Sequence, residues 1–597
     1  FVSVFVVAFI VQHQEISYYT MWVAGLVVLG IFVYMLIAGS SGERAGLIAA
    51  LVLMVETLLF FIFYGQMSTS LTLFALRNVD LDQHLFGSTL WTWSPGQYQA
   101  LNPIWIMILS PILAWWVSLP AVRRTPQLSE AQTLFLARLA RRTWSFFETQ
   151  AGPQHNWLPP DSLQEHPHTM VTPRTSPGAI GLGLLASLAA WDFGFIPASA
   201  LLARVRAGFD SMALLERHRG HFYTGYDTRT LAPLQPTYIS TADSGSLAGH
   251  LLTLAVGLEQ LADQPIAGVR FLAGARATLQ VIDELPQAQA TGGAALAACR
   301  TALGPDSCRN ADTLPGLADC LGAAASAAAA LCAALPKDAD PLLRTWCERL
   351  DGECRAAQAD LLALAPWMRA VHEYVLDASL TRIPTLRELA AFTPPAGSGG
   401  SGNGSARALA ALVEEGVATA RARLDEIAAL AGQARAFGAM DFGLLYRRNE
   451  GLLAVGYHVA EERLDSESHA LLASEARLAS FLGIAQGQLP PSHWQALGRP
   501  LAFVGREQLL QSWSGGLDAY LAPLLVMPSW DGTLLERSCR AAVRVQAEHA
   551  RRHGMPWGMA ASACHAVDAA LHYEHRAFGA PGMGLRRGLD DDLVAAP

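Results

Sequence analysis

Long apolar stretches dominate the first 120 residues and are interrupted only briefly by polar ones. Residues 21–39, 46–65 and 101–120 are each long enough to cross a bilayer as a helix, although Pro103 and Pro111 predict a kink in the last. Residues 1–12 are too short to cross alone, and we expect them to belong to a truncated span. The pattern predicts a transmembrane segment of about four spans over residues 1–120.

After residue 120 the apolar residues recur at helical spacing and polar loops separate the helical stretches. Segments 126–150, 178–194 and 197–220 each place apolar side chains on one face of a helix. The loops between such segments are long and aromatic, and strand signals are few and short. Helices that alternate with long loops are typical of an α/α barrel, or toroid, whose loops gather at one end. The sequence therefore predicts a mainly α protein: transmembrane helices followed by an α/α toroid.

Residues 281–425 differ from the segments on either side. They are rich in alanine and include a Gly/Ser connector at 394–406. We expect a helical insertion that carries little chemistry. The predicted organisation is a transmembrane segment (1–120), a first barrel part (121–280), the insertion (281–425) and a second barrel part (426–597).

Charge supports the division at residue 120 and narrows the function. Only seven of the first 120 residues are charged, against 86 of the remaining 477. The net charge is −9 and no long basic run is present, so we expect no nucleic-acid partner. Six of the eight cysteines fall between Cys299 and Cys354 without paired CxxC spacing, which favours buried free thiols over a zinc site. We expect no cofactor and no metal.

Five arginines follow the last predicted span: Arg123, Arg124, Arg138, Arg141 and Arg142. By the positive-inside rule they place the end of that span in the cytoplasm. The same rule places the loop that carries Arg44 in the cytoplasm and residues 66–100 outside. The soluble part is therefore predicted to be cytoplasmic.

The loops of the predicted barrel carry the residue types of a carbohydrate site. Aromatic rings stack on sugar faces, while carboxylates with amides or arginine hold hydroxyl groups. Each candidate could instead support the fold, but their clustering in Pro/Gly-rich loops favours a site. The candidates are Asn156, Trp157, Asp161, Glu165, Arg174, His221, Tyr223, Tyr226, Asp227, Asp243, Asp441, Tyr446, Tyr457, Trp494, Trp513, Tyr520 and Trp557.

Glu475 is the candidate for acid–base chemistry. It stands among Leu, Ala and Phe at the start of an apolar helix, which would raise its pKa and suit a general acid. The alternative is a first-turn glutamate that the helix dipole favours. Cleavage or transfer of a glycosidic bond needs a second carboxylate as nucleophile or base.

Residues 1–116 resemble the proton-dependent oligopeptide transporters of the major facilitator superfamily. The resemblance rests on "FYGQMSTSLTLFALRNVDLDQHLFG" and "WSPGQYQALNPIWIMILSPILAW". It implies a fragment from the middle of that fold, without the first helix and its ExxER proton-coupling motif. We expect a membrane anchor in contact with the lipid bilayer; the alternative is that this part is the functional one, a fragment of a proton-coupled transporter.

Residues 108–597 resemble the central glycoamylase-like domain of cyclic β-1,2-glucan synthases. The blocks "HFYTGYDTRTLAPL", "STADSGSLAGHL", "LLASEARLASF", "SWSGGLDAYLAPLL" and "MPWGMAASACHAVD" occur in the family's order. The resemblance implies an α/α toroid that cyclises β-1,2-linked glucan by retaining transglycosylation. It also implies a multi-pass protein of the bacterial inner membrane, with a glycosyltransferase domain before this region and a phosphorylase-like domain after it.

By this resemblance Glu475 falls on the acid/base glutamate, whereas two other family glutamates are missing. The nucleophile's loop usually reads WG-I-S-E-S, and Ala561 stands at its glutamate; a second block usually reads SG-x-M-F-E-Y-L, and Ala519 stands there. Asp518 is one residue away from Ala519, which predicts a side chain pointing elsewhere. Without the nucleophile, we expect glucan binding with impaired transglycosylation.

Overall fold

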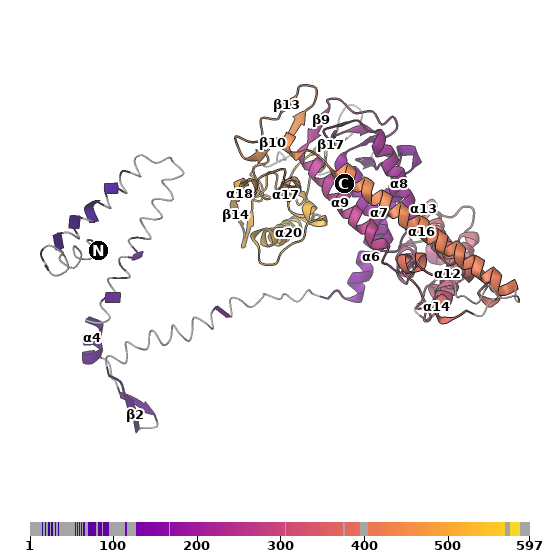
Figure 1. Ribbon diagram of the computed structural model, residues 1–597, viewed down its shortest axis with the longest axis horizontal. Coiled ribbons are helices and arrows are strands. Elements are labelled where there is room, and N and C mark those ends of the chain that lie inside the picture. The colour runs from indigo at the N-terminus through magenta and orange to yellow at the C-terminus, as the bar shows by residue number, and fades with distance from the viewer. Residues whose placement is uncertain are drawn as a thin grey trace. The chain divides into compact units, whose positions relative to one another are not determined.

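The computed structural model describes residues 127–585 apart from 166–167, 305, 374–375, 394–403 and 568–572, together with 70–78, 82–85, 88–94, 114–115 and scattered residues nearer the N-terminus. The chain divides into two compact units, Phe1–Val122 and Arg123–Pro597. Most of the described helices belong to the C-terminal unit (Figure 1).

The N-terminal unit contains helix α4 (Ser70–Asn78) and an antiparallel hairpin of β1 (Asp82–Leu85) and β2 (Ser88–Thr92). The predicted span 1–12 lies outside the described residues. The spans 21–39, 46–65 and 101–120 are described only at scattered positions, all of them helical. The membrane spans therefore stay a prediction.

Among the described residues, one helix has the length and apolar character to cross a membrane: α12 (Leu314–Ala334), in the predicted insertion. It packs against α11 (Ala288–Ala302) and α13 (Pro341–Leu364), and Leu314, Leu317 and Leu331 are buried there. These contacts are those of a core helix within a folded helical layer.

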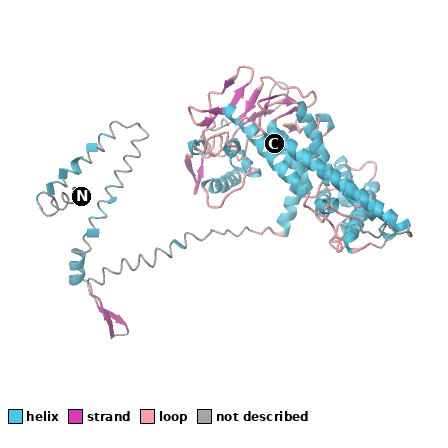
Figure 2. Ribbon diagram, in the orientation of Figure 1, coloured by secondary structure: helices cyan, strands magenta, loops and turns pink. Residues whose placement is uncertain are grey.

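The C-terminal unit is mainly helical and its strands are short, as the sequence predicts (Figure 2). The predicted helix at 126–150 is α6 (Glu130–Gln150), which begins at a capping box of Ser129 and Gln132. The other helices are α7 (Pro177–Asp192), α8 (Ala198–Leu214), α9 (Thr241–Leu261), α10 (Arg270–Asp283), α14 (Ala378–Thr381), α15 (Leu386–Ala390), α16 (Gly404–Gly438), α17 (Arg477–Ala485), α18 (Ser492–Ala496), α19 (Asp518–Leu521) and α20 (Leu534–His553). Short 3₁₀ helices are η1 (Pro153–His155), η2 (Pro366–Glu373), η3 (Phe442–Leu445) and η4 (Ala522–Leu525).

The strands form small antiparallel pairs within the long loops. A three-stranded sheet, in the order β13 (Arg463–Leu464), β12 (Gly456–His458), β9 (Tyr238–Ser240), joins loops far apart in sequence. The remaining pairs are β3 (Leu163–Gln164) with β4 (Met170–Val171), β5 (Arg174–Thr175) with β8 (Tyr226–Asp227), β6 (Arg217–His218) with β7 (His221–Phe222), β10 (Tyr446–Arg447) with β11 (Leu452–Leu453), β14 (Leu501–Val504) with β15 (Glu507–Leu510), and β16 (Ser562–Val567) with β17 (Tyr573–Arg576).

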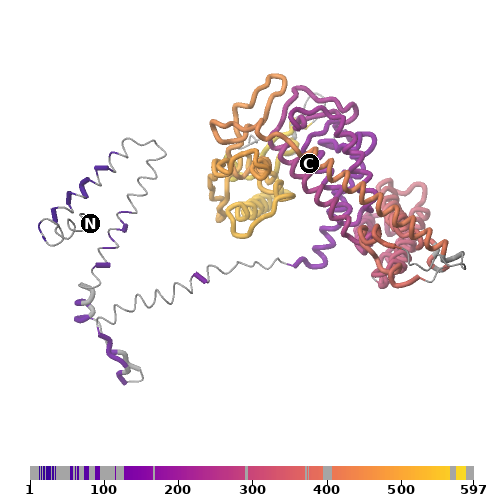
Figure 3. Tube along the Cα trace, in the orientation of Figure 1, coloured from indigo at the N-terminus to yellow at the C-terminus, as the bar shows by residue number. Residues whose placement is uncertain are grey.

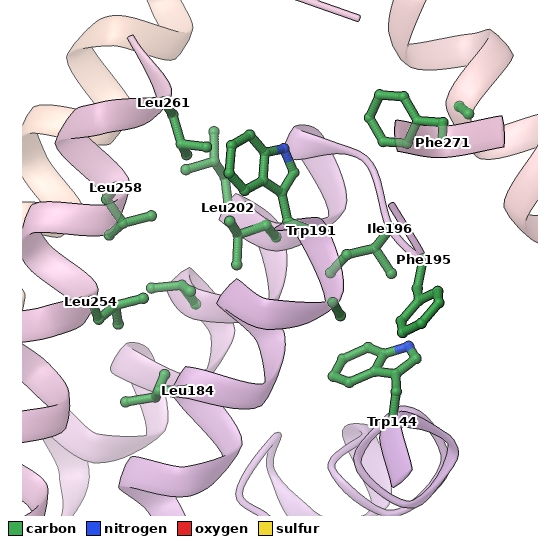
Figure 4. Packing of buried hydrophobic residues seen from close by; sticks show 14 of the residues in the cluster. Trp144, Leu184, Trp191, Phe195, Ile196, Leu202, Leu254, Leu258, Leu261 and Phe271 are labelled. Atoms are coloured by element: carbon green, nitrogen blue, oxygen red, sulfur yellow. The ribbon is translucent and has the colours of Figure 1, made fainter. Parts of the chain in front are cut away.

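Helix α9 is the centre of the packing, because α7, α16 and α17 all lie against it. The core here contains Trp144, Trp191, Leu202 and Leu254 from α6, α7, α8 and α9 (Figure 4). The guanidinium groups of Arg204 and Arg270 lie over the rings of Trp144 and Trp191, at 5.0 and 3.9 Å. The 35-residue α16 continues from this core to the helices of the predicted insertion (Figure 3). The helices of 281–425 share one hydrophobic cluster with the helices that precede them.

The close crossing of α9 and α17 requires a glycine, and this gives a stability prediction. A Cβ at Gly245 would lie 2.5 Å from the Ala479 nitrogen and 2.6 Å from its Cβ. We expect Gly245→Ala to lower the free energy of unfolding by about 1–3 kcal/mol, because the helices must move apart. Chemical denaturation measures this change.

Gly432 in α16 is the matched control, because nothing lies within 4 Å of a Cβ added there. Gly432→Ala should raise the free energy of unfolding by about 0.5–1 kcal/mol through helix propensity alone. A loss at Gly432 as large as the loss at Gly245 would contradict the packing explanation.

Three of the arginines used above for membrane orientation have partners in the folded domain. Arg138 and Arg142 pair with Glu284, and the buried Arg141 lies 2.7 Å from Glu353. Arg123 and Arg124 lie outside the described residues. Arg138, Arg141 and Arg142 form ion pairs within the folded unit, so their presence near the last predicted span has a structural explanation. The membrane orientation therefore stays a prediction.

Candidate active site

Four carboxylates from separate segments of the C-terminal unit lie close enough to shift one another's pKa. The pKa of Asp243 is raised to about 6 by burial and then by the charge of Asp161. The pKa of Glu475 is raised to about 7 by burial and then by the charges of Asp518 and Asp243. Like charges have this effect only at short range, so Asp161, Asp243, Glu475 and Asp518 form one group, the carboxylate cluster.

One side of the carboxylate cluster lies at the starts of α7 and α9. The hydroxyl of Ser176, the N-cap of α7, donates to Asp161 Oδ1 at 2.7 Å, and Arg174 Nε lies 3.2 Å from Oδ2. Burial raises the pKa of Asp161, while the Ser176 hydrogen bond and the Arg174 charge oppose the rise. Asp243 lies in the first turn of α9, and Gly178 lets it approach α7, because a Cβ there would be 3.0 Å from Asp243 Oδ1.

The other side of the cluster is held together by Arg477. This arginine is buried and donates to the Leu472 carbonyl at 3.2 Å and to two carbonyls of α19 at 3.4 and 3.1 Å. One side chain thus ties the loop that carries Glu475 to the helix that begins at Asp518. We call Arg477 the clamp between these two carboxylates.

Glu475 has the properties of a general acid. Its side chain is exposed to solvent, yet the surrounding protein and two neighbouring carboxylates raise its pKa to about 7. A carboxyl group that is both accessible and partly protonated near neutral pH can give its proton to a leaving-group oxygen. Since Glu475 precedes α17 (Arg477–Ala485), its place is in the loop before that helix rather than in the first turn.

Asp518, which sequence reasoning sets aside, is the residue of α19 that belongs to the cluster. It is the first neighbouring charge that raises the pKa of Glu475. Ala519 instead is 8% exposed and packs in a second hydrophobic cluster with Leu510 and Tyr520. The one-residue offset thus separates the directions of the two side chains: residue 519 faces the core, and Asp518 lies by Glu475.

The stretch 554–568 adjoins the same helix start. Its Met559 carbonyl accepts hydrogen bonds from the Leu517 N–H and from Gln546 Nε2, both at 2.9 Å. Gln546 is fully buried and also donates to the Gly515 carbonyl at 3.2 Å. Ala561, two residues after Met559, is half-buried directly before β16. The backbone that would present the family nucleophile is thus fixed next to the segment that presents Asp518.

His575 completes the group of charged residues. It lies on β17, where it pairs with Ala563 of β16. Its charge lowers the pKa of both Asp518 and Asp161, against the larger effect of burial in each case. His575, Arg477, Gln546 and Ser176 are site residues that sequence reasoning missed, because only tertiary contacts bring them to the carboxylates.

Many of the predicted sugar-binding residues are engaged by the protein itself. The buried Tyr226 and Tyr520 hydroxyls donate to backbone carbonyls at 2.6 and 2.7 Å, and Tyr223 donates to Glu216 at 3.1 Å. His221 is fully buried between Ser244 and the Asp441 carbonyl. These side chains hold the loops in place.

Four further candidates are also in structural contacts. Asn156 donates to two backbone carbonyls, and Trp157 packs against the Arg204 guanidinium at 5.6 Å. Asp227 accepts from two N–H groups of its own turn, and Tyr457 stacks on His218 at 5.7 Å. These contacts are of the kind expected if the four residues support the fold, which is the alternative that the sequence left open.

The remaining candidates keep exposed surface. Trp513 and Trp557 are 59% and 57% exposed, which leaves their faces available for stacking. Asp441 pairs with Arg219 at 3.4 Å and lines a cavity of about 610 Å³. Tyr446 contacts the His493 ring edge-on. Trp494 lines an apolar cavity of about 640 Å³ beside α17 and α20. Glu165 is exposed. Neither cavity is lined by the carboxylate cluster.

Comparison with known proteins confirms both resemblances. The chain is 33% identical to the cyclic beta-(1,2)-glucan synthase of Rhizobium meliloti over 503 residues, which are 82% of this chain. Residues 2–156 match the POT family, and 105 residues are 42% identical to dipeptide and tripeptide permease A of Pectobacterium carotovorum. The chain spans 16% of the length of the synthase and 20% of the permease.

Among solved structures, an endo-beta-1,2-glucanase of Chitinophaga pinensis, in complex with sophorotriose and glucose, is similar over 77% of this chain and 76% of that one. The sequence identity is 10% and the TM-score is 0.38. A score this low does not define the fold.

Proposed function

We propose that the C-terminal unit is a carbohydrate-active domain of the cyclic β-1,2-glucan synthase type, built as an α/α toroid, that binds β-1,2-linked glucan but is impaired in transglycosylation. One observation carries the proposal: the carboxylate cluster keeps a protonatable Glu475, while Ala561 occupies the position of the nucleophile. A retaining enzyme needs both groups. Binding contacts do not depend on the nucleophile.

Residues of the cluster and exposed tryptophans of the same unit support sugar binding. Asp161 and Arg174 offer an acceptor and donors for hydroxyl groups, and Trp513 and Trp557 offer exposed ring faces. We expect these four residues to contact glucan. The other predicted contacts, such as Asp441 and Tyr446, belong to the same proposal; Asp441 would exchange its pairing with Arg219 for a sugar hydroxyl.

We also propose a multi-pass location in the bacterial inner membrane, with the C-terminal unit in the cytoplasm. The similarity of the N-terminal unit to a bacterial permease supports a bilayer as partner, as do its apolar stretches. A glycosyltransferase domain and a phosphorylase-like domain are proposed partners, by analogy with the synthase family.

A second candidate function is a proton-coupled oligopeptide transporter fragment, which the POT-family match over residues 2–156 favours. Proton-driven uptake of a labelled dipeptide into vesicles that contain this chain would support it. Glucan binding without uptake would support the anchor role.

The proposal predicts selective binding. In isothermal titration calorimetry, the full chain should bind linear β-1,2-glucan and give no heat with a linear β-1,3-glucan of equal length. Asp161→Asn should weaken binding about tenfold, because a charge-assisted hydrogen bond contributes about 1.5–3 kcal/mol.

Asp531→Asn is the control for this titration. Asp531 is a half-exposed carboxylate that pairs with Arg540 and is not in the cluster. Its replacement should leave affinity unchanged. Equal binding of both glucans, or no binding of the β-1,2-linked one, would contradict the proposed function.

A further inference from the structure

We propose that Asp518 activates a water molecule opposite Glu475, so that this domain hydrolyses β-1,2-glucan with inversion at the anomeric carbon. The inference rests on the proposed function, because it takes β-1,2-glucan as the bound substrate. It adds an activity and a catalytic residue to that function.

The backbone places Asp518 and Glu475 together independently of their charges. Arg477 bonds to the loop before α17 and to two carbonyls of α19, so the two carboxylates cannot separate without breaking buried hydrogen bonds. Burying the Arg477 guanidinium requires that these acceptors stay in place. The clamp fixes an acid and a second carboxylate at one site.

Asp518 has an oxygen available for a small ligand. Its Oδ1 is buried and has no hydrogen-bond partner in the part of the chain that the structure describes. A buried carboxylate oxygen without a donor is unfavourable, and a water molecule would satisfy it. Burial also raises the pKa of Asp518, which makes it a stronger base than an exposed aspartate.

Alanine at position 561 removes side-chain volume near the start of α19. Met559 bonds to Leu517 and to Gln546, so Ala561 and Asp518 stand on adjoining backbone segments. Alanine lacks the four heavy atoms of the glutamate side chain beyond Cβ, and a water molecule occupies roughly 30 Å³. With Ala561 there, the attacking atom comes from solvent rather than from a side chain.

The step balances without another reactant. The water oxygen bonds to C1 of the sugar while its proton passes to the Asp518 carboxylate. The bond from C1 to the glycosidic oxygen breaks, and that oxygen keeps the electron pair and takes the proton of Glu475. The products are a shortened glucan and a new reducing end in the α configuration, and solvent then exchanges the protons.

The neighbouring charges set the expected pH dependence. Glu475 faces Asp518 and Asp243, Asp243 faces Asp161 and Arg174, and Asp518 faces His575. Since Glu475 must carry its proton, hydrolysis should decline as the pH rises above about 7.

The test uses the full chain with linear β-1,2-glucan. Reducing ends are counted over time, the first anomer is identified by proton NMR, and glucan affinity is measured by calorimetry. We expect slow hydrolysis that gives the α-anomer first. Asp518→Asn and Glu475→Gln should each lower the rate by about 10²–10⁴-fold and change affinity less than about threefold, because each removes one acid–base group.

Asp531→Asn is again the control and should keep the full rate. Asp518→Ser is a second variant, with a smaller polar side chain at the first position of α19, in case the asparagine variant unfolds. A β-anomer as first product, or full activity in either Asp518 variant, would overturn the inference. Glucan binding without hydrolysis would overturn the inference alone, whereas absence of binding would overturn the proposed function.

Discussion

Replacing Ala561 by glutamate is expected to give the chain strong transglycosylation of linear β-1,2-glucan, a gain of about 10³-fold or more over the unmodified chain. The change returns a carboxylate to the position of the family nucleophile, in a chain that keeps the proposed acid Glu475. Cyclic products can be separated by chromatography and identified by mass. The first-formed anomer should then be β.

Ala560→Glu is the matched control, because it adds the same side chain one position earlier on the same half-buried segment. It should give no gain, since a one-residue shift turns the carboxylate to another direction. Strong transglycosylation by the unmodified chain would contradict the proposal. So would an Ala561→Glu variant that binds glucan but stays inactive.

The structure argues against repairing position 519 as well. Ala519 lies in the second hydrophobic cluster beside Leu510 and Tyr520. A glutamate there would bury a carboxylate without a partner, which is costly. Recovery of activity should therefore depend on position 561, with Asp518 already beside Glu475.

The second large effect is on stability. Arg141→Met should lower the free energy of unfolding by about 3–5 kcal/mol at pH 8.5. Arg141 is fully buried, lies 2.7 Å from Glu353 and donates to Thr278 at 2.8 Å. Without the arginine, Glu353 is a buried charge that has lost its ion-pair partner.

At about pH 5.5, Arg141→Met should lower the free energy of unfolding by less than at pH 8.5. Proton linkage gives the direction of this pH dependence. Burial raises the pKa of Glu353 to about 7 even with Arg141 present, and removing Arg141 raises this pKa further. The folded variant then binds more protons than the unfolded chain. Its free energy of unfolding therefore falls as the pH rises from the ordinary pKa of about 4.5 through the raised one.

Arg142→Met is the control for the buried arginine. Arg142 is half-exposed and pairs with Glu284 at the surface, so its loss should cost at most about 1 kcal/mol. Urea denaturation at both pH values measures the two variants. Equal losses at positions 141 and 142, or a larger loss for Arg141→Met at low pH, would contradict this account.

Sequence periodicity was sufficient for the helices, because an apolar face is a property of residues close together along the chain. The segment 126–150 is an example, and its helix α6 starts at the Ser129 capping box. Glu475 was also identified from its neighbours in the sequence. Apolar residues next to a glutamate predict burial, and burial is the largest cause of its raised pKa.

Periodicity could not separate binding residues from structural ones. Tyr226 and Tyr520 look like sugar-stacking aromatics in the sequence, but each is buried and its hydroxyl is satisfied by a carbonyl. Which of the two roles a tyrosine has depends on whether another segment covers it. That information is not local.

The sequence by itself determined the mainly helical architecture and the absence of a glutamate at position 561, and it identified Glu475 as the candidate acid. Only the tertiary structure decided that Asp518 joins Glu475 and that Ala519 faces the core. The physical reason is that distant hydrogen-bond partners, and not neighbouring residues, hold this four-residue helix in place. Arg477 bonds to its carbonyls, and Gln546 bonds to the Gly515 carbonyl just before it.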